Sequence, residues 1–165
     1  DWFRACAKAV AETNSPVSWT VPITGFEVVQ NGWNYMKTER DGRPRAGKRQ
    51  LVTLKLTDDV LPLKQRNGAA PNVIHSLDAA NLVLTIGSLP EELPLGTAHD
   101  CYFTLAADAD RVNQAARAAF VQLHRESILD KLHAHFSALA GRELPKPPKG
   151  ELALEATLDS QYLLS

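Results

Sequence analysis

The chain has 165 residues, of which 44% are hydrophobic and 22% charged, and its formal net charge is −1. A chain of this length and composition can bury a core of its own. No apolar run approaches the roughly 20 residues that cross a bilayer, and no secretory signal opens the sequence, so no membrane association is expected. The two cysteines do not form a Cys-x-x-Cys pair, which excludes a disulfide framework and favours a reducing compartment.

A helix and then a strand are predicted for the first part of the chain. Residues 2–13 place apolar side chains near helical spacing, and Asn14-Ser15-Pro16 breaks the helix. From Val17 to Val21 apolar and polar residues alternate, which is the pattern of a half-buried strand.

A long basic hairpin is predicted over residues 27–57. Residues 26–29 and 51–56 are strand candidates, and residues 41–44 (Asp-Gly-Arg-Pro) supply a turn between them. From Lys37 to Arg66 there are nine basic and four acidic residues, a local balance of +5. This cluster is either a solvated basic loop or an arm that contacts phosphates.

A second helix is predicted from Pro71 to a stop at Gly87. Proline fits the first helical turn because its missing amide hydrogen costs nothing there. His75, Asp78 and Leu82 fall on one face, so His75 and Asp78 project together. Another face of the same helix is shared by Val73, Ile74, Leu77, Ala80 and Leu84.

A polar pair, His99-Asp100, is flanked by two predicted short strands, at Thr97-Ala98 and from Cys101 to Leu105. An ionised aspartate in a buried sheet is costly unless it is paired or bound to a cation. Magnesium prefers carboxylate oxygens, and a single aspartate holds it only with help from a second carboxylate and the substrate. The pair therefore predicts a magnesium ligand, Asp100, and a missing partner carboxylate.

Two packed helices are predicted within residues 107–141. Asp108 can cap the first, whose apolar stripe runs from Val112 to Leu123, and the second ends at Gly141. A stiff proline-rich connection and a final amphipathic segment, residues 151–165, follow. Three histidines of the helical region are expected on the surface: His124, His133 and His135.

Several segments, taken jointly and in order, resemble the single-subunit, bacteriophage-type RNA polymerases, the family that includes the mitochondrial transcriptases. Residues 71–79 (Pro-Asn-Val-Ile-His-Ser-Leu-Asp-Ala) and 99–104 (His-Asp-Cys-Tyr-Phe-Thr) are similar to the C-terminal palm motifs of that family. Residues 16–30 resemble the segment after the fingers, and residues 64–72 resemble the entry to the histidine helix. The ending, residues 159–165, resembles the hydrophobic carboxy terminus of the family, so the natural C-terminus is expected here.

The resemblance implies an α+β fold, namely a partial polymerase palm with a small antiparallel sheet, a long basic β-hairpin and packed helices. Residues 71–105 would hold the histidine helix and the catalytic hairpin. Asp100 resembles the second catalytic aspartate, a ligand of the two Mg²⁺ ions, and His99 beside it would position the primer end or the incoming nucleotide. His75 matches the family histidine near the substrate sugar.

Residues 27–57 occupy the place of the hairpin that these polymerases insert into the promoter major groove, where arginine and lysine suit phosphate and guanine contacts. The implied partners are double-stranded promoter and template DNA, nascent RNA and ribonucleoside triphosphates. The implied location is the cytoplasm of an infected host cell, with the mitochondrial matrix as the alternative. The candidate DNA-binding residues are Lys37, Arg40, Arg43, Arg45, Lys48 and Arg49.

Three departures from the family pattern matter. Asn81 stands where many members have a histidine, and Cys101-Tyr102-Phe103 replaces a commoner arrangement. In addition, no segment resembles the upstream palm motif with the first metal-binding aspartate, or the fingers helix. The chain is therefore expected to be the C-terminal portion or a split subunit of a DNA-directed RNA polymerase, a nucleotidyltransferase that is inactive without its missing N-terminal and fingers part.

Other classes of function remain open. A non-catalytic nucleic-acid-binding module derived from such a polymerase would use the basic hairpin and leave Asp100 without a role. A metal phosphohydrolase also uses His-Asp pairs, but carries them on helices with further ligands. Cys101 as a nucleophile with His99 is the least favoured alternative.

Overall fold

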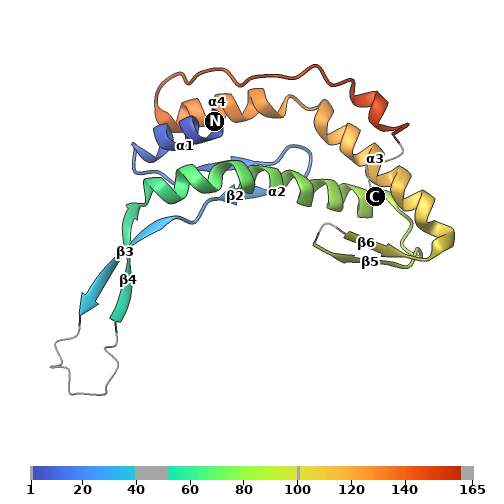
Figure 1. Ribbon diagram of the computed structural model, residues 1–165, viewed down its shortest axis with the longest axis horizontal. Helices are drawn as coiled ribbons and strands as arrows, with labels where there is room; N and C mark the ends of the chain where they lie inside the picture. Colours follow the sequence, from blue (N-terminus) through green and yellow to red (C-terminus); the bar gives the residue numbers. More distant parts are fainter. Residues whose placement is uncertain (1, 40–51, 100, 161–165) are drawn as a thin grey trace.

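The computed structural model describes residues 2–39, 52–99 and 101–160 (Figure 1). The described helices are α1 (Trp2–Ala11), α2 (Pro62–Ser88), α3 (Ala109–Arg125) and α4 (Ile128–Ala140). Small two-stranded antiparallel sheets accompany them, so the predicted α+β class is confirmed. Within the described residues no helix is both long enough and apolar enough to cross a membrane.

The long helix α2 runs through the middle of the molecule, with α1 and α4 on one side of it (Figure 1). The core forms where these helices meet the first strand, and its largest buried side chain is Phe136 of α4, only 1% exposed. Val10 of α1, Val73 of α2 and Leu123 of α3 are also fully buried. The core therefore fixes α2 along its length, because three helices bury apolar side chains against it.

Helix α2 begins at Pro62, so the prediction that it starts at Pro71 is wrong. Pro62 occupies the first turn, where proline is tolerated, whereas Pro71 lies inside the helix and cannot donate to the carbonyl four residues earlier. Burial of Gln65 and Ala69 holds the additional turns in place. Ile74, expected on the same helical face as Val73, is 50% exposed, whereas Val73 is only 1% exposed.

The strands pair differently from the predicted arrangement. β1 (Ser18–Thr20) pairs with β2 (Glu27–Val29), so residues 27–29 are not the first strand of the long hairpin. That hairpin consists of β3 (Trp33–Glu39) and β4 (Val52–Val60), with an irregularity between Trp33 and Tyr35. The predicted turn at residues 41–44 lies outside the described residues.

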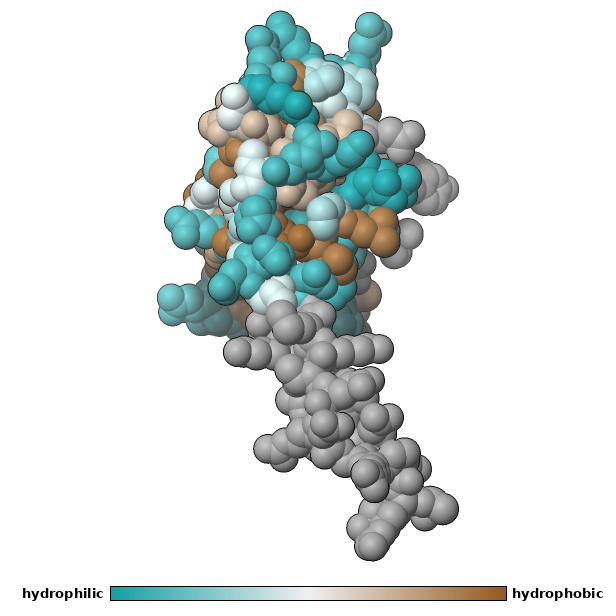
Figure 2. All heavy atoms as spheres, turned by 90° about the vertical axis from the view of Figure 1, so that its left-hand side faces the viewer, coloured by the Kyte–Doolittle hydropathy of each residue, from teal (hydrophilic) through white to brown (hydrophobic). Residues whose placement is uncertain are grey.

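The β3–β4 hairpin projects away from the helical body at the N-terminal end of α2 (Figure 1). Seen from that end, the surface of the body mixes hydrophilic and apolar side chains (Figure 2). The hairpin is therefore attached to the body through its base, and the contacts there decide its direction.

Two helices follow the second half of α2, as predicted. Asp108 is the residue before α3, but its side chain makes no capping hydrogen bond, and a 3-10 turn (Ala106–Asp108) leads into the helix. Helix α4 ends at Gly141, whose φ of 65° lies in the left-handed region that glycine adopts readily. The chain then runs back over α4 and α3 to a short 3-10 helix, Leu154–Thr157 (Figure 1).

Two of the three histidines expected on the surface are half-buried and bonded. His124 Nδ1 lies 2.8 Å from the carbonyl oxygen of Phe120, and the two rings stack at 4.0 Å. His133 Nε2 lies 2.7 Å from the carbonyl oxygen of Leu144 and so ties the returning chain to α4. His135 is exposed, as predicted.

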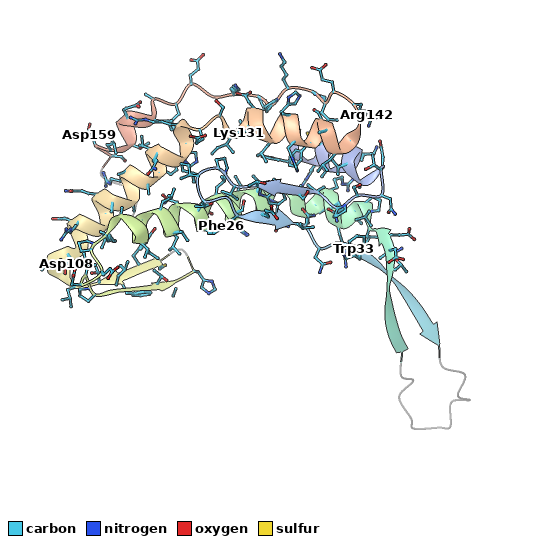
Figure 3. The ribbon with its side chains drawn as sticks, turned by 180° about the vertical axis from the view of Figure 1, so that it is seen from behind. Phe26, Trp33, Asp108, Lys131, Arg142 and Asp159 are labelled. Carbon is cyan, nitrogen blue, oxygen red and sulfur yellow. The ribbon has the colours of Figure 1, made fainter. Side chains whose placement is uncertain are left out.

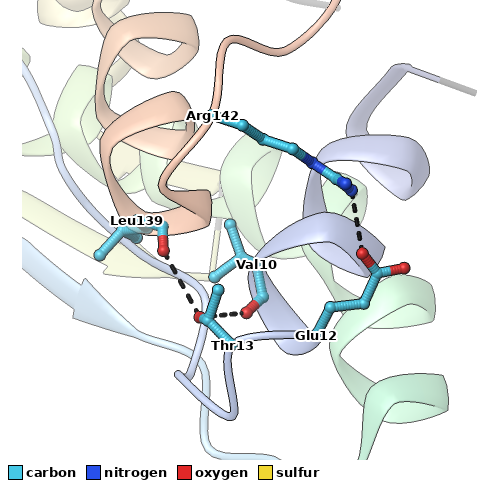
Figure 4. A network of polar contacts seen from close by, with 5 residues as sticks. All are labelled: Val10, Glu12, Thr13, Leu139 and Arg142. Carbon is cyan, nitrogen blue, oxygen red and sulfur yellow. Dashed lines mark hydrogen bonds and ion pairs between the residues drawn. The ribbon is translucent and has the colours of Figure 1, made fainter.

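The joint between α1 and α4 combines a short polar network with a surface ion pair (Figure 4). Thr13 Oγ1 donates to the carbonyl oxygens of Val10 and Leu139, at 2.8 and 3.4 Å. Arg142 Nη2 lies 2.9 Å from Glu12 Oε2, with both side chains half exposed or more. The network joins two helices that are distant in the sequence.

Candidate active site

The predicted short strands on either side of His99 are present. β5 (Leu95–Ala98) and β6 (Cys101–Thr104) are antiparallel, and Ala98 pairs with Cys101, so His99 directly follows the last paired residue of β5. His99 has a φ of 56°, a left-handed conformation that two-residue hairpin turns often require. A non-glycine residue held in this region is frequently part of a functional site. Asp100 itself lies outside the described residues.

One face of α2 presents four side chains at consecutive helical positions. His75, Asp78, Ala79 and Leu82 are spaced i, i+3, i+4 and i+7, which places them one above another along the helix. The opposite face carries Val73 and Ala80 into the core. The predicted grouping of His75, Asp78 and Leu82 is confirmed.

His99 and this face of α2 line a common pocket of about 480 Å³. Its lining residues are His75, Asp78, Ala79, Leu82 and His99. Two imidazoles and a carboxylate thus lie beside two apolar side chains, Ala79 and Leu82, a combination that can hydrogen-bond hydroxyl and phosphate groups. All three polar side chains are exposed, so a ligand can reach them.

The structure adds Asp78 to the candidate site. Its position three residues after His75 already predicted that the two side chains project together, but the sequence alone assigned it no role. The carboxylate now stands in the same pocket as both predicted histidines.

A partly buried contact supports the helical turn that carries His75. Trp19 of β1 is 3% exposed, and its Nε1 donates to Ser76 Oγ at 2.9 Å. Ser76 Oγ in turn donates to the carbonyl oxygen of Val73 at 2.7 Å. No local sequence pattern could have paired Trp19 with Ser76, because the residues are 57 positions apart.

The two cysteines differ in environment. Cys101 opens β6 and is exposed, whereas Cys6 of α1 is buried. Burial raises the pKa of the Cys6 thiol from 9.0 to about 11, because a thiolate is poorly solvated there. Cys6 is therefore a core residue and not a nucleophile.

The remaining predicted site residues are only partly covered by the structure. Lys37 lies in β3, and the other five candidate DNA-binding residues fall outside the described part. Among the described residues no group of three or more histidine, cysteine or acidic side chains could hold a metal ion. The metal-binding role of Asp100 and the DNA contacts stay predictions.

Comparison with known proteins identifies the family. The family model described as DNA-dependent RNA polymerase matches residues 1–144. The chain is 34% identical to DNA-directed RNA polymerase 2A of Nicotiana tabacum, over 99% of this chain and 49% of that protein. It is 34% identical to the chloroplastic/mitochondrial DNA-directed RNA polymerase 2B of the same plant. The chain is also 35% identical to the chloroplastic/mitochondrial DNA-directed RNA polymerase 2 of Arabidopsis thaliana.

The chain covers only part of these relatives. It spans 16% of the length of the two organellar polymerases and about half of polymerase 2A, although 99% of the chain itself is aligned in every case. The alignment thus includes both the helix with His75 and the turn with His99. The chain belongs to the phage-type, single-subunit family of DNA-dependent RNA polymerases.

Proposed function

We propose that this chain is the C-terminal portion, or a split subunit, of a single-subunit DNA-directed RNA polymerase and supplies part of its nucleotidyl-transfer site. The observation that carries the proposal is the pocket in which His75 and Asp78 of α2 meet His99 of the β5–β6 turn. Two segments that resemble polymerase motifs, and that lie apart in the sequence, line one cavity.

The pocket residues have complementary roles in this proposal. His75 hydrogen-bonds the ribose of the incoming ribonucleotide, and Asp78 adds an acceptor on the same helical face. His99 approaches from the hairpin turn and positions the primer end or the nucleotide phosphates. Because the side chains come from two different elements, the substrate is held between a helix and a hairpin.

Magnesium fits this site only if further carboxylates join it. The described part of the pocket offers one carboxylate and two imidazoles, whereas magnesium prefers oxygen ligands. We propose that Asp100, the residue after His99, supplies a second carboxylate and that polypeptide outside this chain completes the site. Bound magnesium would stabilise charge on the attacking and leaving oxygens. The chain alone is then inactive.

The β3–β4 hairpin is proposed to contact promoter DNA. Its predicted basic side chains would neutralise phosphates, with double-stranded DNA, nascent RNA and ribonucleoside triphosphates as the partners of the assembled enzyme. The infected host cell stays the predicted location, although the relatives above are named as chloroplastic and mitochondrial enzymes. Fractionation of the source cells distinguishes these locations.

The test combines this chain with the remaining part of the polymerase and measures incorporation of labelled nucleotides on a promoter template. Asp100→Asn is expected to lower incorporation at least about a hundredfold, the scale of lost transition-state charge stabilisation. Asp159→Asn is the matched control, because Asp159 is exposed in the returning segment (Figure 3) and outside the pocket.

Two outcomes contradict the proposal. The first is incorporation by the chain without any partner. The second is full activity of the assembled Asp100→Asn variant. If that variant instead binds DNA normally and no assembly ever polymerises, the non-catalytic nucleic-acid-binding function is the correct one.

A further inference from the structure

Two buried side-chain amides hold the base of the β3–β4 hairpin. Gln65 of α2 is fully buried, and Gln30, just before β3, is 6% exposed. Gln65 Oε1 accepts a hydrogen bond from the backbone amide of Val17 at 3.0 Å, and its Nε2 donates to the carbonyl oxygen of Gln30 at 3.0 Å. One helix side chain thus binds two neighbouring backbone segments.

Gln30 returns the contact to the first turns of α2. Its Nε2 donates to the carbonyl oxygens of Lys64 and Gln65, at 2.9 and 2.8 Å. The backbone amide of Leu61 also donates to the carbonyl oxygen of Gly32 at 2.7 Å. The hydrogen bonds run in both directions, so the hairpin base and the helix start can meet in only one register.

Two glycines make room for this Gln30–Gln65 pair. A Cβ atom at Gly68 would lie 2.7 Å from Gln30 Nε2, and one at Gly32 would lie 2.7 Å from Gln65 Nε2. The amides cannot move aside without breaking their buried hydrogen bonds. The pair therefore accounts for a glycine inside α2, where alanine is otherwise favoured.

The second strand of the hairpin is anchored as well. The backbone amide of Val60, at the end of β4, donates to Asn14 Oδ1 at 3.0 Å. Asn14 Nδ2 lies 3.4 Å from the carbonyl oxygen of Asp58. Both strands are thus attached to the body by directional polar contacts at the point where the hairpin leaves it, close to Trp33 (Figure 3).

We propose that the Gln30–Gln65 pair is a positioning device that fixes the direction of the β3–β4 hairpin relative to the pocket of His75 and His99. The same rigid helix carries Gln65 and His75, ten residues apart, which corresponds to a rise of about 15 Å along the helix axis. If the proposed function holds, the device sets the distance between promoter recognition and nucleotidyl transfer. Gln30 and Gln65 are then positioning residues and not catalytic ones.

The geometric claim is tested on this chain alone. The substitutions Lys37→Cys in β3 and Val83→Cys in α2, made in a Cys101→Ser background, each carry one nitroxide spin label. Pulsed electron paramagnetic resonance then measures the distribution of distances between the two labels, which reports the direction of the hairpin. The native chain is expected to give one narrow peak. Gly68→Ala is expected to broaden or displace it, because the new methyl group displaces the Gln30 amide.

Gly87→Ala is the matched control, since a Cβ atom there meets nothing within 4 Å and the residue lies in the same helix. Gly32→Ala would place a methyl group against the amide of Gln65 instead of that of Gln30. It is the alternative variant if the Gly68→Ala chain does not fold. In a Gln30→Ala background, Gly68→Ala should cause a much smaller additional change, because the contact with Gln30 is gone and only Asn72 Nδ2, at 3.2 Å, stays close to the new Cβ atom. Unchanged peaks in both glycine variants, or a broad peak in the native chain, would overturn the proposal.

The functional consequence is tested in the assembled polymerase. Gly68→Ala should lower promoter-dependent initiation about tenfold relative to extension of a primed, promoter-free template, the order expected for one or two lost hydrogen bonds. Equal losses on both templates contradict a positioning role. If the native assembly does not polymerise at all, the proposed function fails, while the distance measurement still decides whether the device exists.

Discussion

The two hairpins flanking α2 are attached to the body in opposite ways. β3–β4 is held at its base by buried amides, through Gln30 and Gln65. β5–β6 instead contacts α3 through β6, along which exposed residues (Cys101, Phe103) alternate with half-buried ones (Tyr102, Thr104). Phe103 is 59% exposed, and Leu105, directly after β6, is 60% exposed.

The comparison distinguishes contacts that fix the direction of a hairpin from contacts that only keep a hairpin attached to the body. A hydrogen bond is strong only over a narrow range of distances and angles. Hydrogen bonds at the base of a projecting hairpin therefore fix the direction of that hairpin. An apolar face holds an element in place without fixing its angle as strictly. Because an isolated two-stranded hairpin is only marginally stable, β5–β6 depends on its contact with α3.

Of the substitutions that probe the two hairpins, Gln65→Leu is expected to cause the largest loss in the free energy of unfolding. It would leave the amide of Val17 and the carbonyl of Gln30 buried without partners, at a cost of about 3 kcal/mol in the free energy of unfolding. Urea unfolding followed by circular dichroism measures the loss. Gln114→Leu, at an exposed position of α3, is the control. Equal effects of the two substitutions would contradict a stabilising role of the buried Gln30–Gln65 pair.

The second prediction concerns the two faces of β5–β6. Tyr102→Ala should lower the free energy of unfolding by about 1 to 2 kcal/mol, whereas Phe103→Ala should change it by less than about 0.5 kcal/mol. The reason is that Tyr102 is half-buried and Phe103 is mostly exposed. Thermal unfolding of the two variants measures the difference, and a larger effect at Phe103 would show that the faces have been assigned the wrong way round.

The two cysteines should differ in chemical reactivity, because one is exposed and the other is buried. Cys101 on the open hairpin should react quickly with iodoacetamide at pH 8, whereas Cys6 should react only on unfolding. Burial raises the folded pKa of Cys6 from 9.0 to about 11, so the folded state holds this proton more tightly. Its contribution to stability is present below pH 9 and is lost as the pH rises toward 11.

Subtracting the pH dependence of Cys6→Ala from that of the native chain isolates this contribution, because lysines and tyrosines titrate equally in both. Urea midpoints from pH 8 to pH 11 provide the measurement. A native chain whose stability falls no more than that of the variant would be at odds with a buried thiol.

The smallest effect is expected at the α1–α4 joint. Glu12→Gln removes an ion pair with Arg142 whose side chains are 50% and 60% exposed, so the free energy of unfolding should change by less than about 0.5 kcal/mol. The change should vanish at high salt. A loss as large as that of Gln65→Leu would mean that exposed polar contacts match buried ones in this protein.

Local patterns in the sequence predicted the elements that local interactions decide. The helix ending before Asn14, the stop at Gly141 and the strands around His99 all follow from spacing and turn residues. The early start of α2 did not follow, because burial of Gln65 outweighs the local signal of Pro71. The pairing of β2 with β1 was missed for the same reason, since pairing is a tertiary contact.

The candidate site shows the same limit. Motif resemblance found His75 and His99, and helical spacing found Asp78, but only the fold could show that they line one cavity. The supports of the site escaped prediction entirely. Trp19 reaches Ser76 across 57 positions, and Gln30 reaches Gln65 across 35, distances over which no sequence pattern carries information.

The contact between Trp2 and the returning chain has a consequence for biosynthesis. Trp2 Nε1 donates to the carbonyl oxygen of Pro145 at 2.6 Å, across 143 positions, and its ring lies 6.2 Å from that of Phe136. On the ribosome, α1 is made long before these partners emerge. Closing so long a loop is slow and entropically costly, so α1 cannot reach its final packing until the chain has been translated beyond Pro145.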